Sequence, residues 1–567
     1  MLRSTVLLFM LLALAFLIFG AVINGEVITV DDPHQLQQIE KRHAWNVEKT
    51  FIRKNTTGLY YRPLITLSFT ADKMLWSADP RMMRSVNIVL HAFNAFLVFF
   101  LARFLFSGCN WCNSFSFICA ILFLWHPLTT ESVNWISGRT DVLAATFVYF
   151  SAVCLLYFRS QKKWSYLFLS LGLLICGLLA KETAIAFLAG IVFLLWAQDD
   201  APRFNVKNVL NRTGVLFLFL SLVTVAAWSC FFYLRDLVLK DDSSRIALTL
   251  RVMDTDWGHT FFISMRALGF YIKKVFLPLP LNFAIFEVDP LYELLAFLVL
   301  FFLYYLFIKR SLAGGYVLTG VALISPAFPI AFNQIAWTPF AERYVYISLG
   351  FILPAFVYFV SELKLKKVVR FGFLAVLVVA CGVVTYQRSV IWKTNEALWK
   401  DTVEKSPISQ KAWNNYGVAL QEQGRYEEAE NIFSIAASKT KFGYRDKYDI
   451  NMAVSMMSRH DYYNAKKKLL KVLELSSGTS NRALNVLLEV ADAEAIRRDE
   501  RISEIRSTLQ RLANTSGKPG YYYQLGRLAK SLKQNDEARS FFEKAYEVAL
   551  DSDPIKEKAE KALSSLP

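Results

Sequence analysis

Two adjacent carboxylates, Asp31 and Asp32, follow an apolar segment of roughly residues 6–23. This segment is long enough to cross a bilayer, so the acidic pair lies where the chain leaves the membrane. A neighbouring like charge and a low-dielectric environment both raise the pKa of a carboxyl group. Such a pair suits a general base, or a site that handles metal or phosphate. The alternative, a hydrated pair at a helix end, is not excluded by the dipeptide alone.

A second polar cluster, residues 126–141, connects two apolar segments. Charged groups at membrane depth are costly and usually have a function. Arg139 is suited to a bidentate contact with a phosphate. His126 and Glu131 are suited to orienting Arg139 or to holding a sugar hydroxyl. The alternative is that Arg139, Glu131 and Asp141 pair with one another and only fix the turn.

Further charged residues lie at the same ends of other apolar segments. Arg343, preceded by Glu342, is a second phosphate candidate, and Lys181 and Glu182 are adjacent. Each of these groups has an alternative role as an interface anchor. Arg62 belongs to the first polar loop and is placed to close over a pocket.

Other chemistry has weaker support in the sequence. His91 and Asn94 lie one turn apart inside an apolar segment, a pattern more typical of helix–helix hydrogen bonds than of ligands. Cys109-x-x-Cys112 lacks a second pair, so no zinc site is expected. We predict no metal ligands. Paired carboxylates permit a divalent cation without requiring one, so the cofactor is undetermined.

The composition is that of a polytopic membrane protein. Of 567 residues, 54% are hydrophobic and 15% aromatic, and the mean hydropathy is +0.33. A soluble domain has more charge and fewer aromatic residues. The net charge of +16 does not indicate nucleic-acid binding, because Lys and Arg concentrate in short loops between apolar segments. The seven cysteines lie in or beside apolar segments, so no disulfide framework is expected.

The apolar segments predict an all-α bundle of about eleven spans. After the first they lie near 86–106, 114–128, 142–158, 164–180, 183–197, 213–234, 291–308, 314–333, 344–361 and 369–386. Basic loops near 159–163, 203–212, 309–310 and 364–370 then share one side, which is cytoplasmic by the positive-inside rule. The first loop (25–85), the 127–141 turn and the C-terminal domain face outward. Within 235–290, residues 261–274 read as an amphipathic interfacial helix, or alternatively as another span.

The C-terminal part follows a tetratricopeptide pattern of large, small and aromatic residues. The first unit covers Ala412–Phe433, the second includes Ala465, and the last includes Gly526 and Phe542. A degenerate unit is expected at 480–515. We therefore divide the chain into a membrane domain (1–390), a junction (391–409) and a repeat domain (410–567). Such arrays usually bind peptides, although a purely structural cap or a dimerisation surface is the alternative.

Taken in order, these features resemble one family. Asp31-Asp32, Tyr61-Arg62-Pro63-Leu64, the 126–141 stretch, Ala341-Glu342-Arg343-Tyr344 and the repeat tail resemble the TMTC (transmembrane and tetratricopeptide repeat containing) proteins. These belong with the GT-C glycosyltransferases, alongside the protein O-mannosyltransferases. Trp392, Trp399 and Pro407 also resemble the family's junction.

The resemblance implies transfer of a sugar, with inversion, from a polyprenyl-phosphate donor to a Ser or Thr hydroxyl of a protein. By that similarity Asp31 or Asp32 is the base. A nearby arginine is expected to stabilise the leaving phosphate, and Arg139 and Arg343 are the candidates. The donor, a protein or peptide acceptor bound by the repeats, and membrane lipid are the expected partners, without nucleic acid. The alternatives are a transferase or ligase acting on a glycolipid or polysaccharide, and a non-catalytic scaffold.

The compartment is less constrained. Asn55-Thr56-Thr57 and Asn514-Thr515-Ser516 are outward-facing glycosylation sequons, which a protein of the endoplasmic reticulum is able to use. The short repeat array and the lack of outward cysteines favour a bacterial inner membrane with periplasmic repeats. The endoplasmic reticulum membrane with luminal repeats is the alternative.

Overall fold

The computed structural model describes residues 2–40, 61–197, 256–332, 337–439, 445–493, 498–550 and 553–566. It divides into two compact units, Met1–Asp401 and Thr402–Pro567. Regular structure in these described ranges is helical, apart from one isolated bridge between Ile285 and Phe340. The predicted all-α class is therefore confirmed.

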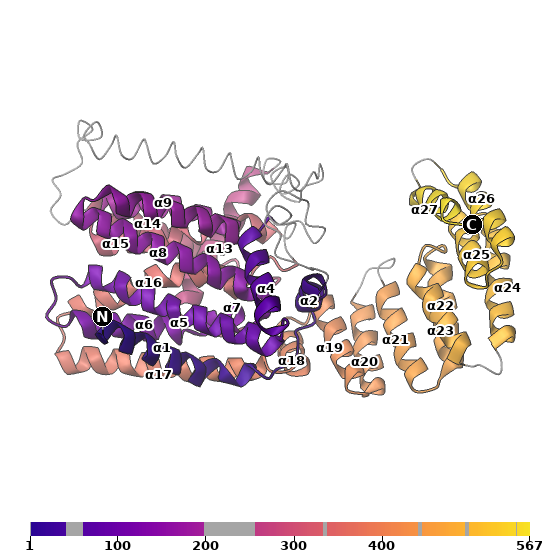
Figure 1. The fold of residues 1–567 in the computed structure, drawn as a ribbon, viewed down its shortest axis with the longest axis horizontal. Helices are drawn as coiled ribbons and strands as arrows, with labels where there is room; N and C mark the ends of the chain where they lie inside the picture. The colour runs from indigo at the N-terminus through magenta and orange to yellow at the C-terminus, as the bar shows by residue number, and fades with distance from the viewer. Residues whose placement is uncertain are drawn as a thin grey trace. The chain divides into compact units, whose positions relative to one another are not determined.

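Long helices that lie side by side form the first unit (Figure 1). They are α1 (Leu2–Phe19), α5 (Pro80–Leu105), α6 (Cys112–Leu124), α8 (Arg139–Gln161), α9 (Trp164–Ala180), α10 (Phe187–Trp196), α13 (Trp257–Phe276), α14 (Tyr292–Lys309), α15 (Leu312–Ala322), α16 (Tyr346–Glu362) and α17 (Lys367–Ile391). Most of them match the apolar segments of the sequence to within a few residues.

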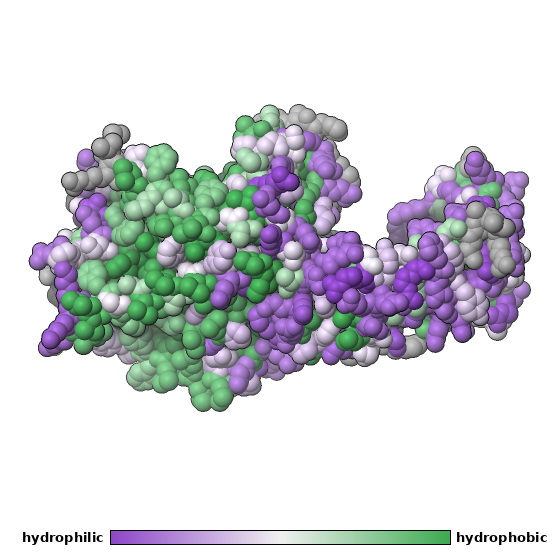
Figure 2. All heavy atoms as spheres, turned by 90° about the horizontal axis from the view of Figure 1, so that it is seen from below, coloured by the Kyte–Doolittle hydropathy of each residue, from purple (hydrophilic) through white to green (hydrophobic). Residues whose placement is uncertain are grey.

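Membrane crossing is supported for most of this bundle. Seven helical segments in the described residues are long and apolar enough to span, or eight if the bent pair Cys112–Leu124 and Pro127–Asn134 counts as one span. The segments Trp164–Ala180 and Glu182–Trp196 are shorter and apolar. The span expected at 213–234 lies outside the described residues, so the total of eleven stays a prediction. Residues 261–274 form part of α13, and their placement in the membrane interface also stays a prediction. The surface of this unit is mostly apolar in Figure 2, as lipid contact requires.

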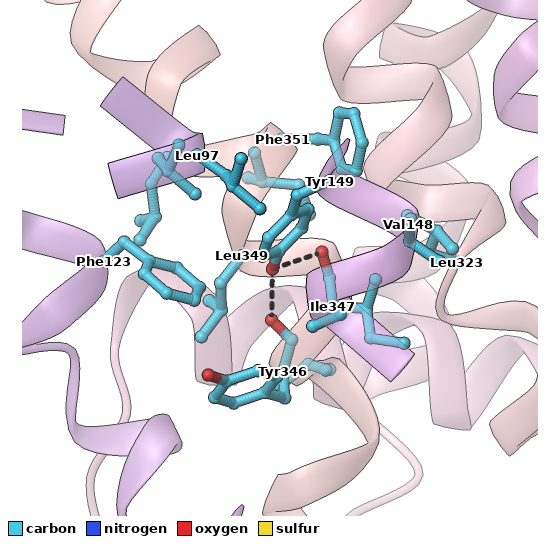
Figure 3. Packing of buried hydrophobic residues seen from close by; sticks show 14 of the residues in the cluster. Leu97, Phe123, Val148, Tyr149, Leu323, Tyr346, Ile347, Leu349 and Phe351 are labelled. Atoms are coloured by element: carbon cyan, nitrogen blue, oxygen red, sulfur yellow. Dashed lines mark hydrogen bonds between the residues drawn. The ribbon is translucent and has the colours of Figure 1, made fainter. Parts of the chain in front are cut away.

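Polar side chains connect the helices inside the bundle. The Tyr149 hydroxyl donates to the carbonyl oxygens of Tyr346 and Ile347, both at 3.0 Å (Figure 3). His91 Nδ1 and the Tyr346 hydroxyl are 2.7 Å apart, and Asn94 donates to the Val142 carbonyl at 2.9 Å. The interpretation of His91 and Asn94 as helix–helix hydrogen-bonding residues is confirmed.

Short elements gather at one end of the bundle. They are η1 (Gly20–Val22), α2 (Asp32–Glu40), α4 (Pro63–Trp76), η2 (Pro127–Thr129), α7 (Thr130–Asn134), η3 (Ile136–Gly138), η4 (Glu182–Ala186), η8 (Glu342–Val345) and the start of α18 (Asn395–Lys405). The basic turns at 162–163 and 363–366 lie at the opposite ends of α8 and α16. Arg139, at the start of α8, and Arg343, just before α16, therefore lie at the ends of these helices opposite to the basic turns.

The second unit is a row of antiparallel helix pairs. They are α19 (Gln410–Glu422) with α20 (Tyr426–Ser438), α21 (Asp446–Ser458) with α22 (Tyr462–Leu475), α23 (Asn481–Ala493) with α24 (Arg498–Ser516), α25 (Pro519–Ser531) with α26 (Asn535–Val548), and a final α27 (Pro554–Ser564). A Cβ at Gly417 would come within 2.5 Å of the Phe433 ring, and one at Gly526 within 2.6 Å of Phe542. The small residues thus permit the close pairing of helices that the repeat pattern predicts. The pair α23–α24 occupies the place of the expected degenerate unit.

Candidate active site at one end of the membrane helices

The acidic pair forms the turn that begins α2. Asp32 is completely buried, whereas Asp31 is exposed. Oδ1 of Asp32 accepts hydrogen bonds from the Ser137 backbone N–H at 3.0 Å and from its hydroxyl at 2.6 Å. Oδ2 is buried and has no hydrogen-bond partner among the described residues. Burial raises the pKa of Asp32 from 3.8 to about 6, although the Ser137 hydrogen bonds and the Arg84 charge oppose the increase.

Arg84, in the first turns of α5, holds the chain that leads into this turn. It is fully buried, and it donates to the carbonyls of Gly25 at 2.8 Å and Glu26. Its charge also acts on Asp32. Sequence reasoning missed Arg84 because it was assigned to the first loop. The signal that could have identified Arg84 is its position as a charged residue next to an apolar helix.

Arg139 lies behind this loop and is surrounded by partners. Its guanidinium pairs with Asp72 at 2.5 Å and donates to Asn87 Oδ1 at 2.8 Å and to the Met83 carbonyl at 2.7 Å. It also lies 4.6 Å from the centre of the Phe69 ring, and it has no exposed surface. This geometry does not support the predicted contact between Arg139 and a donor phosphate. It shows Arg139 connecting α8 to α4 and α5.

Arg343 pairs with Glu131 and so joins η8 to α7. The Arg343 backbone N–H donates to Glu131 Oε2 at 3.0 Å, and the guanidinium donates to Oε1. The guanidinium lies 5.5 Å from the centre of the Trp135 ring and also donates to the Tyr344 hydroxyl at 3.2 Å. The Arg343 side chain keeps 9% of its surface exposed, in contrast to Arg139.

Two further ion pairs neighbour Arg343. Lys181 pairs with Asp141 at 2.5 Å, and both Lys181 Nζ and the Arg343 guanidinium lie over the Tyr344 ring, 5.8 and 4.8 Å from its centre. Arg62 forms a bidentate contact with Glu182, at 2.9 and 2.6 Å. This outer pair is the more accessible, with side chains 20% and 37% exposed. Three cations from α4, the end of α9 and η8 therefore lie close to one another.

The remaining predicted residues support neighbouring backbone. Glu342 accepts from Lys274 at 2.7 Å and from the Asn282 backbone N–H at 2.9 Å, which attaches the loop after α13 to η8. His126 Nε2 is 3.0 Å from the Val275 carbonyl, and its Nδ1 accepts from the Leu128 N–H at 3.4 Å. Both residues are buried. The His126 contact with Val275 orients the 126–141 segment against α13.

The alternative in which Arg139, Glu131 and Asp141 pair with one another is wrong. Each pairs instead with a residue from another helix, respectively Asp72, Arg343 and Lys181. Asp72 and Lys274 were missed because each was read as part of an amphipathic stretch. A buried charge without its partner would cost several kcal/mol, so these pairs determine how the helix ends meet.

The arrangement combines groups that suit sugar transfer. An exposed carboxylate and a buried one are adjacent in the acidic turn, and the buried one, Asp32, contacts Ser137. Arg343 lies against Trp135, two residues before Ser137. Within the described ranges, no three His, Cys, Asp or Glu side chains are grouped so as to hold a metal ion.

Comparison with known proteins supports the resemblance. The family model described as "Tetratricopeptide repeat" matches residues 410–434 and 519–552. Protein O-mannosyl-transferase tmtc2 of Xenopus laevis is 25% identical over 475 residues, which cover 66% of this chain and 54% of the relative. Protein O-mannosyl-transferase Tmtc3 of Drosophila melanogaster is 24% identical over 68% of this chain and 49% of its own length.

A third match extends over more of the chain. Protein O-mannosyl-transferase TMTC3 of Homo sapiens is 24% identical over 538 residues, or 86% of this chain and 57% of the relative. The chain spans about half the length of the curated relatives that it matches. It is a homologue of the TMTC proteins, relatives that carry the name protein O-mannosyl-transferase.

Proposed function

We propose that this protein is a membrane glycosyltransferase that moves a sugar from a polyprenyl-phosphate donor to a Ser or Thr hydroxyl of a protein. The observation that carries the proposal is the meeting of the acidic turn and the cluster of cations around one buried loop, residues 126–141. The names of the relatives support mannose as the sugar and a protein as the acceptor.

In this proposal Asp31 is the general base. It is the exposed carboxylate of the pair, so a bulky acceptor is able to reach it. Asp31 takes the proton of the acceptor hydroxyl while its oxygen forms a bond to the anomeric carbon. The bond from that carbon to the donor phosphate breaks, and the lipid phosphate leaves with the electron pair. Attack opposite the leaving group inverts the anomeric centre.

Asp32 then serves as the anchor of the turn rather than as the base. Both hydrogen bonds from Ser137 reach one of its oxygens, and the side chain has no exposed surface. An anchored neighbour limits the motion of Asp31, which lowers the cost of orienting the base at the moment of reaction.

Arg343, with Lys181 nearby, stabilises the leaving phosphate. Both retain a little exposed surface, and a preorganised cation at a developing negative charge contributes strongly to catalysis. Arg139 keeps its structural partners and is not assigned to the donor.

An apolar groove supports a lipid-linked donor. It has a volume of about 320 Å³, and its lining from α13, α14, α15 and α16 includes Ile272, Phe276, Phe302, Val321, Ile352 and Phe356. Ile352 lies six residues into α16, roughly 9 Å along the helix from Tyr346. A polyprenyl chain in this groove would have its phosphate near the start of α16, where η8 carries Arg343.

The proposed side is the non-cytoplasmic one, because the basic turns lie at the opposite ends of α8 and α16. The relatives described above come from animals, which supports the endoplasmic reticulum over a bacterial inner membrane. The repeats then face the lumen and bind the acceptor.

The test is sugar transfer by the purified protein in detergent or nanodiscs. The assay supplies polyprenyl-phosphate mannose and a Ser/Thr-containing protein acceptor, and it measures mannose incorporation by mass spectrometry. Asp31→Asn removes the base and is expected to reduce kcat by about 10²- to 10⁴-fold while the protein stays folded. Lys400→Ala, an exposed site on α18, is the control. Equal rates for Asp31→Asn and wild type would overturn the proposal.

Removing residues 410–567 separates the enzyme hypotheses. Loss of transfer to protein, with transfer to short peptides retained, supports acceptor binding by the repeats. Transfer to glycolipid alone, in both the full and the shortened chain, would instead support a glycolipid transferase. If the full chain transfers sugar to neither protein nor glycolipid, only the scaffold hypothesis remains.

A further inference from the structure

The segment that leads into the acidic turn is held by the start of α18, more than 360 residues away in sequence. The Glu26 N–H donates to the Lys393 carbonyl at 2.9 Å, and the Asn395 N–H donates to Glu26 Oε2 at 2.7 Å. The Trp399 indole N–H donates to the Thr29 hydroxyl at 3.0 Å. These contacts lie within the first unit, which ends at Asp401.

The Asn395 side chain is the centre of this contact. Its Nδ2 donates to the Val27 carbonyl at 2.9 Å, and its Oδ1 accepts from the Thr29 N–H at 3.1 Å. The side chain thus satisfies one acceptor and one donor of the segment, as a neighbouring strand would. Asn395 is 3% exposed and Trp399 is fully buried, so water does not replace these hydrogen bonds easily.

The contact lies immediately before the acidic pair. Thr29 is two residues from Asp31, and the Val30 N–H donates to the Ile28 carbonyl at 2.9 Å, which tightens the turn. Arg84 holds the carbonyls of Gly25 and Glu26 just upstream, and Ser137 holds Asp32 just downstream. Between these two anchors, Asn395 provides the hydrogen bonds to Val27 and Thr29.

We infer that Asn395 is a positioning residue for the proposed base, acting through Val27 and Thr29 to set the direction in which Asp31 faces the acceptor. Trp399 assists by fixing the Thr29 hydroxyl. This inference rests on the proposed function, because it concerns the same acidic pair. It assigns a role in transfer to α18, the helix between the last membrane helix and the repeats, where the sequence pointed only to Trp399 as part of a family-like junction and to no reacting group.

Two variants test the inference. Asn395→Ala removes the side-chain hydrogen bonds to Val27 and Thr29. Trp399→Phe removes only the indole donor and keeps an aromatic ring in the buried site. We expect kcat to fall about 10- to 100-fold for Asn395→Ala and less for Trp399→Phe, with KM for the donor within about twofold. Lys400→Ala, on the same helix, is the matched control and is expected to leave both constants unchanged.

Hydrogen exchange measured by mass spectrometry gives a readout that does not depend on activity. The Thr29 amide donates to Asn395 Oδ1, so exchange in a peptide covering residues 24–31 is expected to speed up in Asn395→Ala. Peptides from α8 are expected to exchange as in wild type, which shows that the bundle remains folded.

The outcomes separate this inference from the proposed function. A large effect of Asp31→Asn together with unchanged kcat and unchanged exchange in Asn395→Ala would overturn the inference alone. Loss of protection throughout α8 in Asn395→Ala, with normal kcat in Trp399→Phe, would show a general folding role and would also overturn it. No effect of Asp31→Asn would reject the proposed function, whatever the exchange result.

Discussion

Asp31 and Asp32 are neighbours with opposite environments. Asp31 is exposed, whereas Asp32 is buried against Ser137. The difference arises because Asp32 begins α2 and is covered by η3, the short element that directly precedes α8. In the proposed reaction these environments give two identical side chains different roles, Asp31 as the base that an acceptor reaches and Asp32 as the anchor of the turn.

The titration of Asp32 is expected to change stability with pH. Its pKa is about 6 in the folded protein, because burial disfavours the charge, against 3.8 ordinarily. The folded state binds the proton more tightly, so this contribution to stability is present below about pH 4 and is lost as pH rises through about 6. Asp32→Asn is therefore expected to raise the thermal midpoint relative to wild type at pH 7.5. The gain should shrink at pH 5, as measured by differential scanning fluorimetry. An equal difference at both pH values would contradict the assignment.

Substitution by Lys is expected to have different effects at the two arginines that were predicted to bind phosphate. Arg343→Lys keeps a charge beside Glu131 but loses the planar fork, so kcat should fall about 10²-fold with little change in thermal stability. Arg139→Lys is expected to lower thermal stability first, because Arg139 is fully buried and bonded to Asp72, Asn87 and Met83. Transfer assays and thermal midpoints on both variants distinguish the roles. Normal kcat in Arg343→Lys would exclude it as the phosphate ligand.

At the scale of elements, the site depends on close packing between α13 and its neighbours. Lys274 of α13 reaches Glu342 in η8, and the Val275 carbonyl lies next to His126. The approach of α13 to α14 requires Gly269, because a Cβ there would lie 1.9 Å from the Tyr292 carbonyl oxygen. A glycine inside a helix costs about 1 kcal/mol relative to Ala, and the packing offsets this cost.

Gly269→Ala is expected to separate α13 from α14 and to lower the thermal midpoint of the detergent-solubilised protein by several degrees. Transfer should fall too, because the Lys274–Glu342 contact would be displaced. Gly372→Ala is the control, since nothing lies within 4 Å of a Cβ at Gly372 in α17. Equal midpoints for the two variants would show that the α13–α14 contact adapts without cost.

For the whole molecule, the proposed orientation places the repeat unit on the non-cytoplasmic side. Asn514 is exposed near the end of α24 and is followed by Thr515 and Ser516. Expression in animal cells is expected to give N-glycosylation there, seen as an endoglycosidase-sensitive shift that Asn514→Gln abolishes. Digestion of the repeat unit by protease added outside sealed microsomes would contradict this orientation.

The sequence by itself determined the elements and the order in which they occur. Apolar runs located α5, α8, α9, α14, α16 and α17, and the spacing of Ala, Gly and Phe located the helix pairs at both ends of the repeat unit. These features depend on interactions between residues that are close in sequence. A span depends on the free energy of transferring about 20 residues into lipid, and a repeat depends on the fit of two adjacent helices, so both can be recognised in a single sequence. Most charged residues at the helix ends were also recognised from their types and positions, although Arg84, Asp72 and Lys274 were not.

Only the tertiary structure decided which charged groups meet. Arg139 had several acidic candidates in the sequence and pairs with Asp72, 67 residues away. Asn395 contacts Thr29 across 366 residues. Partner choice depends on which helix ends come together in space, and alternative pairings of Arg with Asp or Glu have nearly equal local energy. Burial then selects the pairing, because a charge inside the bundle is stable only beside the partner that packing brings to it.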